Sequence, residues 1–156
     1  MNSKLGAFAI ARRSIALAIF SGQELECWQV RILPNDEDQA KTATAAFVRW
    51  ALDHFHFSAT AIQSGELETH RKEQLRDLAC EVLRENGIPI LVATEDDLFR
   101  AFRNPSLTRR ADLRKLIHQI LPQLAEQRET LPLLDAAALG LYIKTEHLLT
   151  LTTQDQ

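Results

Sequence analysis

The sequence lacks the features that define several large classes of protein. Only two cysteines occur in 156 residues; Cys27 and Cys80 form no CxxC pair and are interpreted as small buried hydrophobic residues, which fits a reducing cytoplasm. No run of about 18 apolar residues exists, so no membrane helix is expected. GxGxxG, GxxxxGK[ST], HExxH and GxSxG motifs are absent, so dinucleotide-binding, P-loop, zincin and hydrolase functions have no support.

What is present is the composition of an ordinary globular domain. Hydrophobic residues make up 46% of the chain and charged residues 25%, so a real core is expected. We predict a single domain over residues 1–151 and a frayed tail over residues 152–156. The net charge of -3 and the pI near 5.9 argue against a protein that coats DNA generally, but they allow a local basic patch.

The order of apolar patterns predicts an α/β fold. Short apolar runs over residues 5–12, 14–20 and 25–33 predict three antiparallel strands joined by tight turns. Strands over residues 59–62 and 88–92 alternate with helices over 39–54 and 67–86, and further helices are expected over 94–102, 108–121 and 132–149. The expected architecture is a five-stranded mixed sheet flanked by helices.

That order, and three stretches of sequence, resemble the RNase H-like fold of RuvC-type Holliday junction resolvases. Residues 8–20 resemble the opening hairpin of that family, residues 107–121 its penultimate helix, and residues 134–141 its final helix, where the family carries an Asp-Ala-Ala-Asp run. The resemblance implies a metal-dependent, structure-selective DNA endonuclease and a homodimer. The apolar stripe Leu113, Leu116, Ile117, Ile120 and Leu121 on the penultimate helix is either core or part of such a dimer interface.

The resemblance also implies a metal site, and most of its ligands are missing. Two-metal cleavage of a phosphodiester holds two divalent cations about 3.5–4 Å apart, mostly with carboxylates. The positions of this sequence that match the ligand slots of the family are Ala11, Gln63, Asp135 and Ala138, and no Asp or Glu occurs between Asn2 and Gln23. We therefore expect no cofactor and no catalysis. Under the alternative, an active nuclease with relocated ligands, Mg²⁺ would be held by Asp135 with Glu66 or Glu68.

Histidines offer no alternative metal site. His54 and His56 bracket Phe55 just past the first expected helix, and no third ligand lies within sequence reach, so we expect structural roles for them.

A basic segment is the remaining functional candidate. It contains Arg100, Arg103, Arg109, Arg110, Arg114 and Lys115, against the single acid Asp112. Guanidinium groups match phosphate well, so the segment is a candidate site for DNA or RNA; the alternative is a solvated helix face. The sequence therefore favours a non-catalytic module that binds nucleic acid or a protein partner.

Overall fold

The structure, a computed structural model, describes residues 4–11, 13–21, 24–64, 70–94, 117, 119, 121 and 136–141. Within these ranges the order is β1 (Lys4–Ile10), β2 (Ser14–Ser21), β3 (Glu24–Ile32), α1 (Glu37–Phe55), β4 (Ala59–Ser64), α2 (His70–Glu85) and β5 (Ile90–Thr94). Residues 136–141 are also helical. Neither α1 nor α2 is both long and apolar enough to cross a lipid bilayer.

The strands form one five-stranded mixed sheet in the order β3-β2-β1-β4-β5. β1 pairs antiparallel with β2, and β2 pairs antiparallel with β3. β4 runs parallel to β1, with Ala7 opposite Ala61, and β5 runs parallel to β4, with Gln63 opposite Ala93. The predicted mixed sheet with three antiparallel strands first is therefore confirmed.

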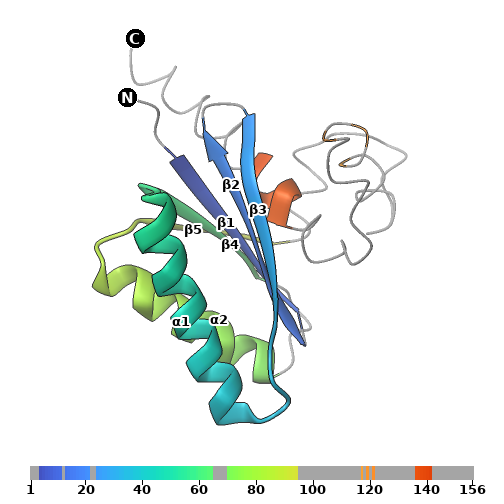
Figure 1. Cartoon of the computed structure of the whole chain (residues 1–156), viewed down its shortest axis with the longest axis vertical. Helices are drawn as coiled ribbons and strands as arrows, with labels where there is room; N and C mark the ends of the chain where they lie inside the picture. The colour runs from blue at the N-terminus through green and yellow to red at the C-terminus, as the bar shows by residue number, and fades with distance from the viewer. Residues whose placement is uncertain are drawn as a thin grey trace.

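Two layers of helix enclose the sheet, and Figure 1 shows α1 and α2 together on one face. Along β1 and β2, the residues that face these helices are large, and they include Phe8, Ile15, Leu17 and Ile19. The ring of Phe8 makes edge contacts with Phe47 of α1 at 6.3 Å and with Phe57 at 6.0 Å between centroids. Burial of these large side chains makes this face the main hydrophobic core.

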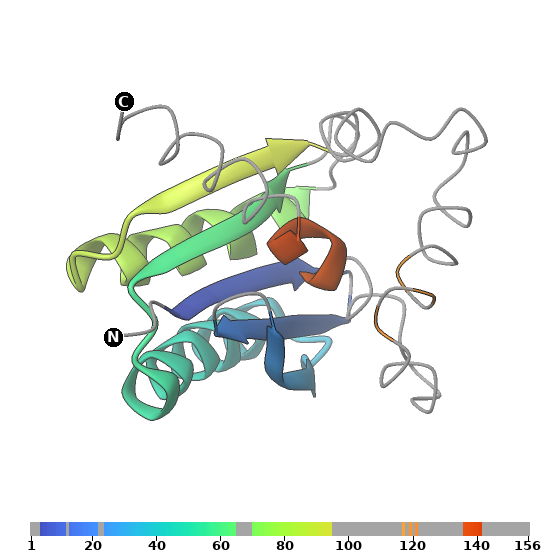
Figure 2. The same ribbon diagram turned by 90° about the horizontal axis from the view of Figure 1, so that it is seen from above.

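The helical segment 136–141, orange-red in Figures 1 and 2, lies on the opposite face of the sheet. Its buried residues pack with Ile117, Leu121 and the other side chains of the same strands. Because side chains alternate across a strand, one sheet presents large residues to α1 and α2 and smaller residues to segment 136–141.

Local signals set where the helices begin and end. Asp36 caps α1 by accepting a hydrogen bond at Oδ1 from the backbone N–H of Gln39 at 2.9 Å, and Glu37 and Asp38 follow in the first turn. Gly87 follows α2 with a φ of +70°, and its N–H donates to the carbonyl of Arg84 at 3.0 Å. The helices predicted over 39–54 and 67–86 are confirmed as α1 and α2, and these caps set the start of α1 and the end of α2.

β5 begins two residues later than the sequence predicts. The backbone N–H of Ile88 donates to the carbonyl of Leu83 at 3.0 Å, so Ile88 belongs to the end of α2. The first carbonyl that joins the parallel ladder is that of Pro89, which accepts from the N–H of Thr60 at 3.0 Å. The helices predicted over 94–102, 108–121 and 132–149 lie largely outside the described residues.

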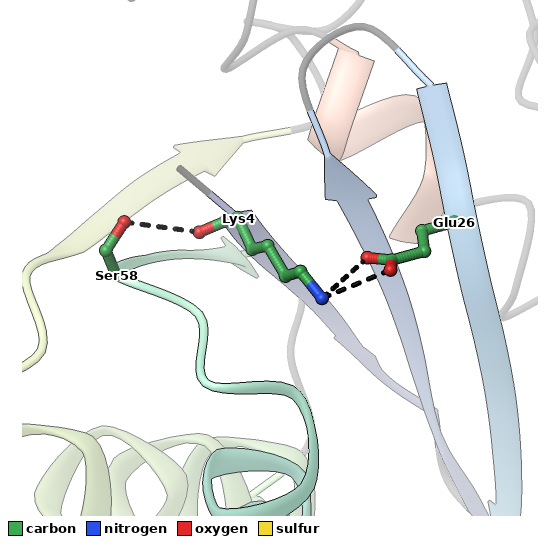
Figure 3. A network of polar contacts seen from close by, with 3 residues as sticks. All are labelled: Lys4, Glu26 and Ser58. Carbon is green, nitrogen blue, oxygen red and sulfur yellow. Dashed lines mark hydrogen bonds and ion pairs between the residues drawn. The ribbon is translucent and has the colours of Figure 1, made fainter. Parts of the chain in front are cut away.

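Contacts at the amino-terminal end of β1 join it to β3 and to the loop before β4, as Figure 3 shows. Lys4 Nζ lies 3.1 Å from Oε1 and from Oε2 of Glu26 in β3. The carbonyl of Lys4 accepts hydrogen bonds from the N–H of Ser58 at 3.0 Å and from its hydroxyl at 3.4 Å. These contacts stabilise one end of the sheet. Ala11 and Gln63 lie at the opposite end, where β1 and β4 have their carboxyl ends.

Candidate functional site

Three of the four positions that match the ligand slots lie in the described part of the chain. Ala11 follows β1 directly and opens the hairpin, where its N–H donates to the carbonyl of Ser14 at 2.8 Å. Gln63 lies in β4 and is half-buried. Ala138 lies in segment 136–141 and is 1% exposed. Since β1 and β4 are parallel, Ala11 and Gln63 meet at the same end of the sheet.

Packing connects Ala138 to the same strands. It belongs to one buried cluster with Ala9 and Ala61, the residues two places before Ala11 and Gln63. Residues two apart on a strand share a face, so Gln63 lies on the sheet face that carries Ala138. Ala9 is 3% exposed and is the last residue of β1 that belongs to this cluster. β1 ends at Ile10, so Ala11 lies in the hairpin that follows.

The face beneath segment 136–141 consists mainly of alanine, and we call it the alanine face. Its strand alanines are buried to 3% exposure or less, and they pack against Ala136, Ala137 and Ala138. These strand residues are Ala7, Ala9, Ala16, Ala18, Ala61 and Ala93. Methyl side chains carry no hydrogen-bonding atoms, so these alanines offer a cation no ligand.

Close approach of the final helix requires a glycine as well. A Cβ atom placed on Gly140 would lie 2.6 Å from Cδ2 of Phe20 and still closer to Cε2. Phe20 is fully buried in β2, so its ring cannot move aside cheaply. Gly140 and the alanine face therefore form a close-packed apolar helix–sheet interface in the place that matches the ligand slots.

The remaining candidate residues lie outside the described residues. They are Asp135, Glu66 and Glu68 among the possible metal ligands, and Arg100, Arg103, Arg109, Arg110, Arg114 and Lys115 in the basic segment. Within the described ranges, no group of three or more His, Cys, Asp or Glu side chains is placed to hold a metal ion.

The histidines and cysteines have structural surroundings. His54 belongs to α1 and stacks on Trp50 with 5.3 Å between ring centroids. His56 takes the left-handed conformation that ends α1, with a φ of 53°. Cys80 is buried in α2, as predicted, and desolvation raises the pKa of its thiol. Cys27, which was also predicted to be buried, is only half-buried, because it lies in the edge strand β3.

The alanine face was not predicted, although the sequence carries its signal. In residues 7–11 and 15–19 alanine alternates with large apolar residues, so one face of each strand must be small and the other large. That period of two predicts a face that a helix can approach closely. It does not predict which helix does so, because that contact joins residues more than a hundred positions apart.

Comparisons with known proteins identify the fold. No protein-family model and no curated protein sequence matches the chain. The solved structure of Thermus thermophilus RuvC is similar to 89% of this chain over 92% of its own length, with a TM-score of 0.73 and 15% identity. The Fowlpox virus resolvase, solved with substrate Holliday junction DNA, is similar to 91% of this chain over 99% of its own, with a TM-score of 0.65 and 11% identity.

The yeast mitochondrial Holliday junction resolvase is similar to 99% of this chain over 85% of its own, with a TM-score of 0.62 and 11% identity. Identities this low show the fold alone. Together with the sheet order and the antiparallel opening strands, these similarities show that the chain has an RNase H-like fold of the RuvC type.

Proposed function

We propose that the protein is a non-catalytic RuvC-like domain, formed by residues 1–151, that binds branched nucleic acid without cleaving it. The observation that carries the proposal is the alanine face, where Ala138 packs closely against β1 and β4 at the place that matches the ligand slots of resolvases. The proposed binding activity is supported by the similarity to a resolvase solved with Holliday junction DNA and by the basic segment.

The described slots do not fit a two-metal centre. Mg²⁺ needs oxygen ligands at about 2.0–2.1 Å and gives up its water reluctantly. Ala11 and Ala138 supply no side-chain oxygen, and the amide of Gln63 supplies no charge. Of the four matched positions only Asp135 carries a carboxylate, so one negative charge would face the four positive charges of two cations. No catalytic step through a metal follows from these residues.

Binding would depend on phosphate contacts from the basic segment. Arg110 and Arg114 are four residues apart, which on the expected helix places both guanidinium groups on one side. Contacts of this kind neutralise phosphates and release counterions, so the affinity falls as salt rises and depends little on base sequence. The binding measured should therefore be strongest at low salt.

The test measures binding and cleavage with the same purified chain. We expect fluorescence anisotropy to show salt-sensitive binding to four-way junctions, and gels to show no cleavage of junctions, duplex DNA or RNA–DNA hybrids in Mg²⁺ or Mn²⁺. The double variant Arg110→Ala/Arg114→Ala should weaken binding and make the salt slope shallower by about 1.8, since each phosphate contact contributes about 0.9.

A matched control removes the same charge from α1 and α2. Arg49 of α1 and Arg84 of α2 are exposed, and Arg49→Ala/Arg84→Ala should leave binding unchanged. No binding to any nucleic acid at low salt would overturn the proposed binding activity and favour a protein partner. Cleavage that is lost in Asp135→Ala would establish an active nuclease with relocated ligands.

A further inference from the structure

The hairpin that joins β1 to β2 carries basic charge without acid. No Asp or Glu occurs from Asn2 to Gln23, and β1, β2, β4 and β5 contain no acidic residue. Arg13 lies in this hairpin and is exposed. Lys4, at the other end of β1, pairs with Glu26 at 3.1 Å, whereas within the described part of the chain no carboxylate forms an ion pair with Arg13. The described carboxylates therefore leave the guanidinium group of Arg13 free to bind an anion.

Hydrogen bonds on either side fix the backbone at Arg13. The N–H of Ala11 donates to the carbonyl of Ser14 at 2.8 Å, and the N–H of Leu33 donates to the carbonyl of Arg13 itself at 2.7 Å. Asp36, three residues beyond Leu33, caps α1 and forms no ion pair with Arg13. A fixed backbone lowers the entropy that is lost when a side chain binds a ligand. The hairpin therefore presents one guanidinium group from a preorganised position.

Arg13 lies at the end of the sheet that carries the matched ligand slots. Ala11 occupies the first-strand slot, and because Arg13 is two residues further on, the two Cα atoms are at most about 7 Å apart. β4 runs parallel to β1, so Gln63 lies at this end as well. The cations of a two-metal site would bring positive charge to this place. In this chain Arg13 brings positive charge there instead.

We propose that Arg13 binds a phosphate of the nucleic-acid backbone directly, without a metal ion between them. A guanidinium group matches phosphate by donating two parallel, charge-assisted N–H···O hydrogen bonds. Such a contact needs no carboxylates, and Ala11 leaves Arg13 without the acidic neighbour that the matched slot carries in resolvases. The inference rests on the proposed function, because it adds a phosphate contact to those of the basic segment.

The first experiment measures the affinity for a four-way junction by fluorescence anisotropy in EDTA, so that no divalent cation takes part. We expect Arg13→Ala to weaken binding about tenfold, as the loss of a charged hydrogen bond commonly does, and to make the salt slope shallower by about 0.9. Arg49→Ala is the matched control: Arg49 is exposed on α1, and this variant should bind like the wild type.

A second pair of variants adds charge instead of removing it. Ala11→Asp should weaken binding in EDTA about tenfold, because the carboxylate attracts Arg13 and repels the phosphate. Ala46→Asp adds the same charge at an exposed position of α1 and should leave the affinity unchanged. Mg²⁺ at constant ionic strength should not restore the binding of Ala11→Asp. Restoration would show that cations carry the phosphate contact and would overturn the proposal.

The third experiment locates the contact in the wild-type chain, so it does not depend on whether a variant folds. Phenylglyoxal modifies exposed guanidinium groups, and mass spectrometry of the peptides reports each arginine separately. We expect saturating junction DNA to slow the modification of Arg13 several-fold and to leave that of Arg49 unchanged.

Junction binding that is equally strong in Arg13→Ala, or that leaves Arg13 unprotected, would overturn this inference and leave the proposed function standing on the basic segment. Binding of the wild type that disappears in EDTA would also overturn it, because the phosphate would then be held through cations. No binding of the wild type to any nucleic acid would overturn the proposed function, and this inference with it.

Discussion

Gly140 packs so closely against the ring of Phe20 that position 140 has no room for a side chain. In an ordinary helix Gly→Ala is favourable by about 0.5–1 kcal/mol. Here the added Cβ would lie 2.6 Å from Cδ2 of a fully buried ring, so overpacking outweighs the helix propensity.

We therefore expect Gly140→Ala to lower the free energy of unfolding by about 1–2 kcal/mol, measured by urea denaturation, because overpacking commonly costs about 1–3 kcal/mol. In a Phe20→Leu background, which removes the ring, the added methyl should cost much less. Equal costs in both backgrounds would show that the ring does not set the position of the helix.

Two buried threonines differ in whether their hydroxyl groups are hydrogen-bonded. Thr60 and Thr44 are both fully buried. The hydroxyl of Thr44 donates to the carbonyl of Ala40 at 2.8 Å, whereas Oγ1 of Thr60 has no hydrogen-bond partner among the described residues. We expect Thr60→Val to raise the free energy of unfolding by about 1 kcal/mol, because it removes an unsatisfied hydroxyl. Thr44→Val, which removes a satisfied one, should be neutral or destabilising in the same denaturation assay.

At the scale of elements, the start of α1 depends on the side chain of Asp36. Its carboxylate accepts from the N–H of Gln39 and lies at the positive end of the helix dipole. We expect Asp36→Ala to lower the free energy of unfolding by about 1 kcal/mol. Asp36→Asn keeps the acceptor and should lose much less, and similar losses in both variants would show that the charge rather than the hydrogen bond stabilises the helix.

Elements of this kind could be predicted from the sequence because their signals are local. The acids before α1 and the Asn86–Gly87 pair after α2 act within one turn, and the helices predicted over 39–54 and 67–86 are confirmed. The parallel pairing of β1 with β4 has no local signal, since it joins strands separated by the whole of α1. The sheet order became predictable only through the resemblance to resolvases.

The irregular pattern of β3 has a structural cause that the sequence conceals. Leu25 packs on the alanine-face cluster and Cys27 packs on the other one, although they are two residues apart. The register shift beside Ile19 and Phe20 inserts a residue between them and reverses the alternation. Leu25, Val30 and Ile32 look alike in the sequence, but Leu25 is 8% exposed and Ile32 is 71% exposed. Only the structure shows that β3 lies at the edge of the described strands.

At the scale of the whole molecule, the question is whether the fold still supports a metal centre. A carboxylate introduced at Ala138 can answer this question through its effect on the free energy of unfolding. If the alanine face is a close-packed apolar interface, a carboxylate at this position is a buried charge without a partner. If the surroundings still form a metal site, divalent cations should stabilise the same carboxylate.

We expect Ala138→Asp to destabilise the chain by about 3–5 kcal/mol at neutral pH, which is the usual cost of an uncompensated buried charge. Ala138→Asn has nearly the same size without the charge, so the difference between the two variants isolates the electrostatic part. Burial would raise the pKa of the introduced carboxyl in the folded state. The difference should therefore be small below about pH 4, where both states are protonated, and should grow by about 1.4 kcal/mol per pH unit as the pH rises toward the folded pKa.

The decisive measurement adds cations to both variants and follows the thermal midpoint at neutral pH. With a close-packed apolar interface, neither Mg²⁺ nor Mn²⁺ raises the midpoint of Ala138→Asp by more than it raises that of Ala138→Asn, because one carboxylate beside Ala9 and Ala61 does not dehydrate a divalent cation. A competent site would bind the cation in the folded state alone and stabilise the Asp variant by about 2.7 kcal/mol at a hundred times the dissociation constant. A rise confined to the Asp variant would thus show that the surroundings still supply further ligands, with Asp135, Glu66 and Glu68 as the candidates.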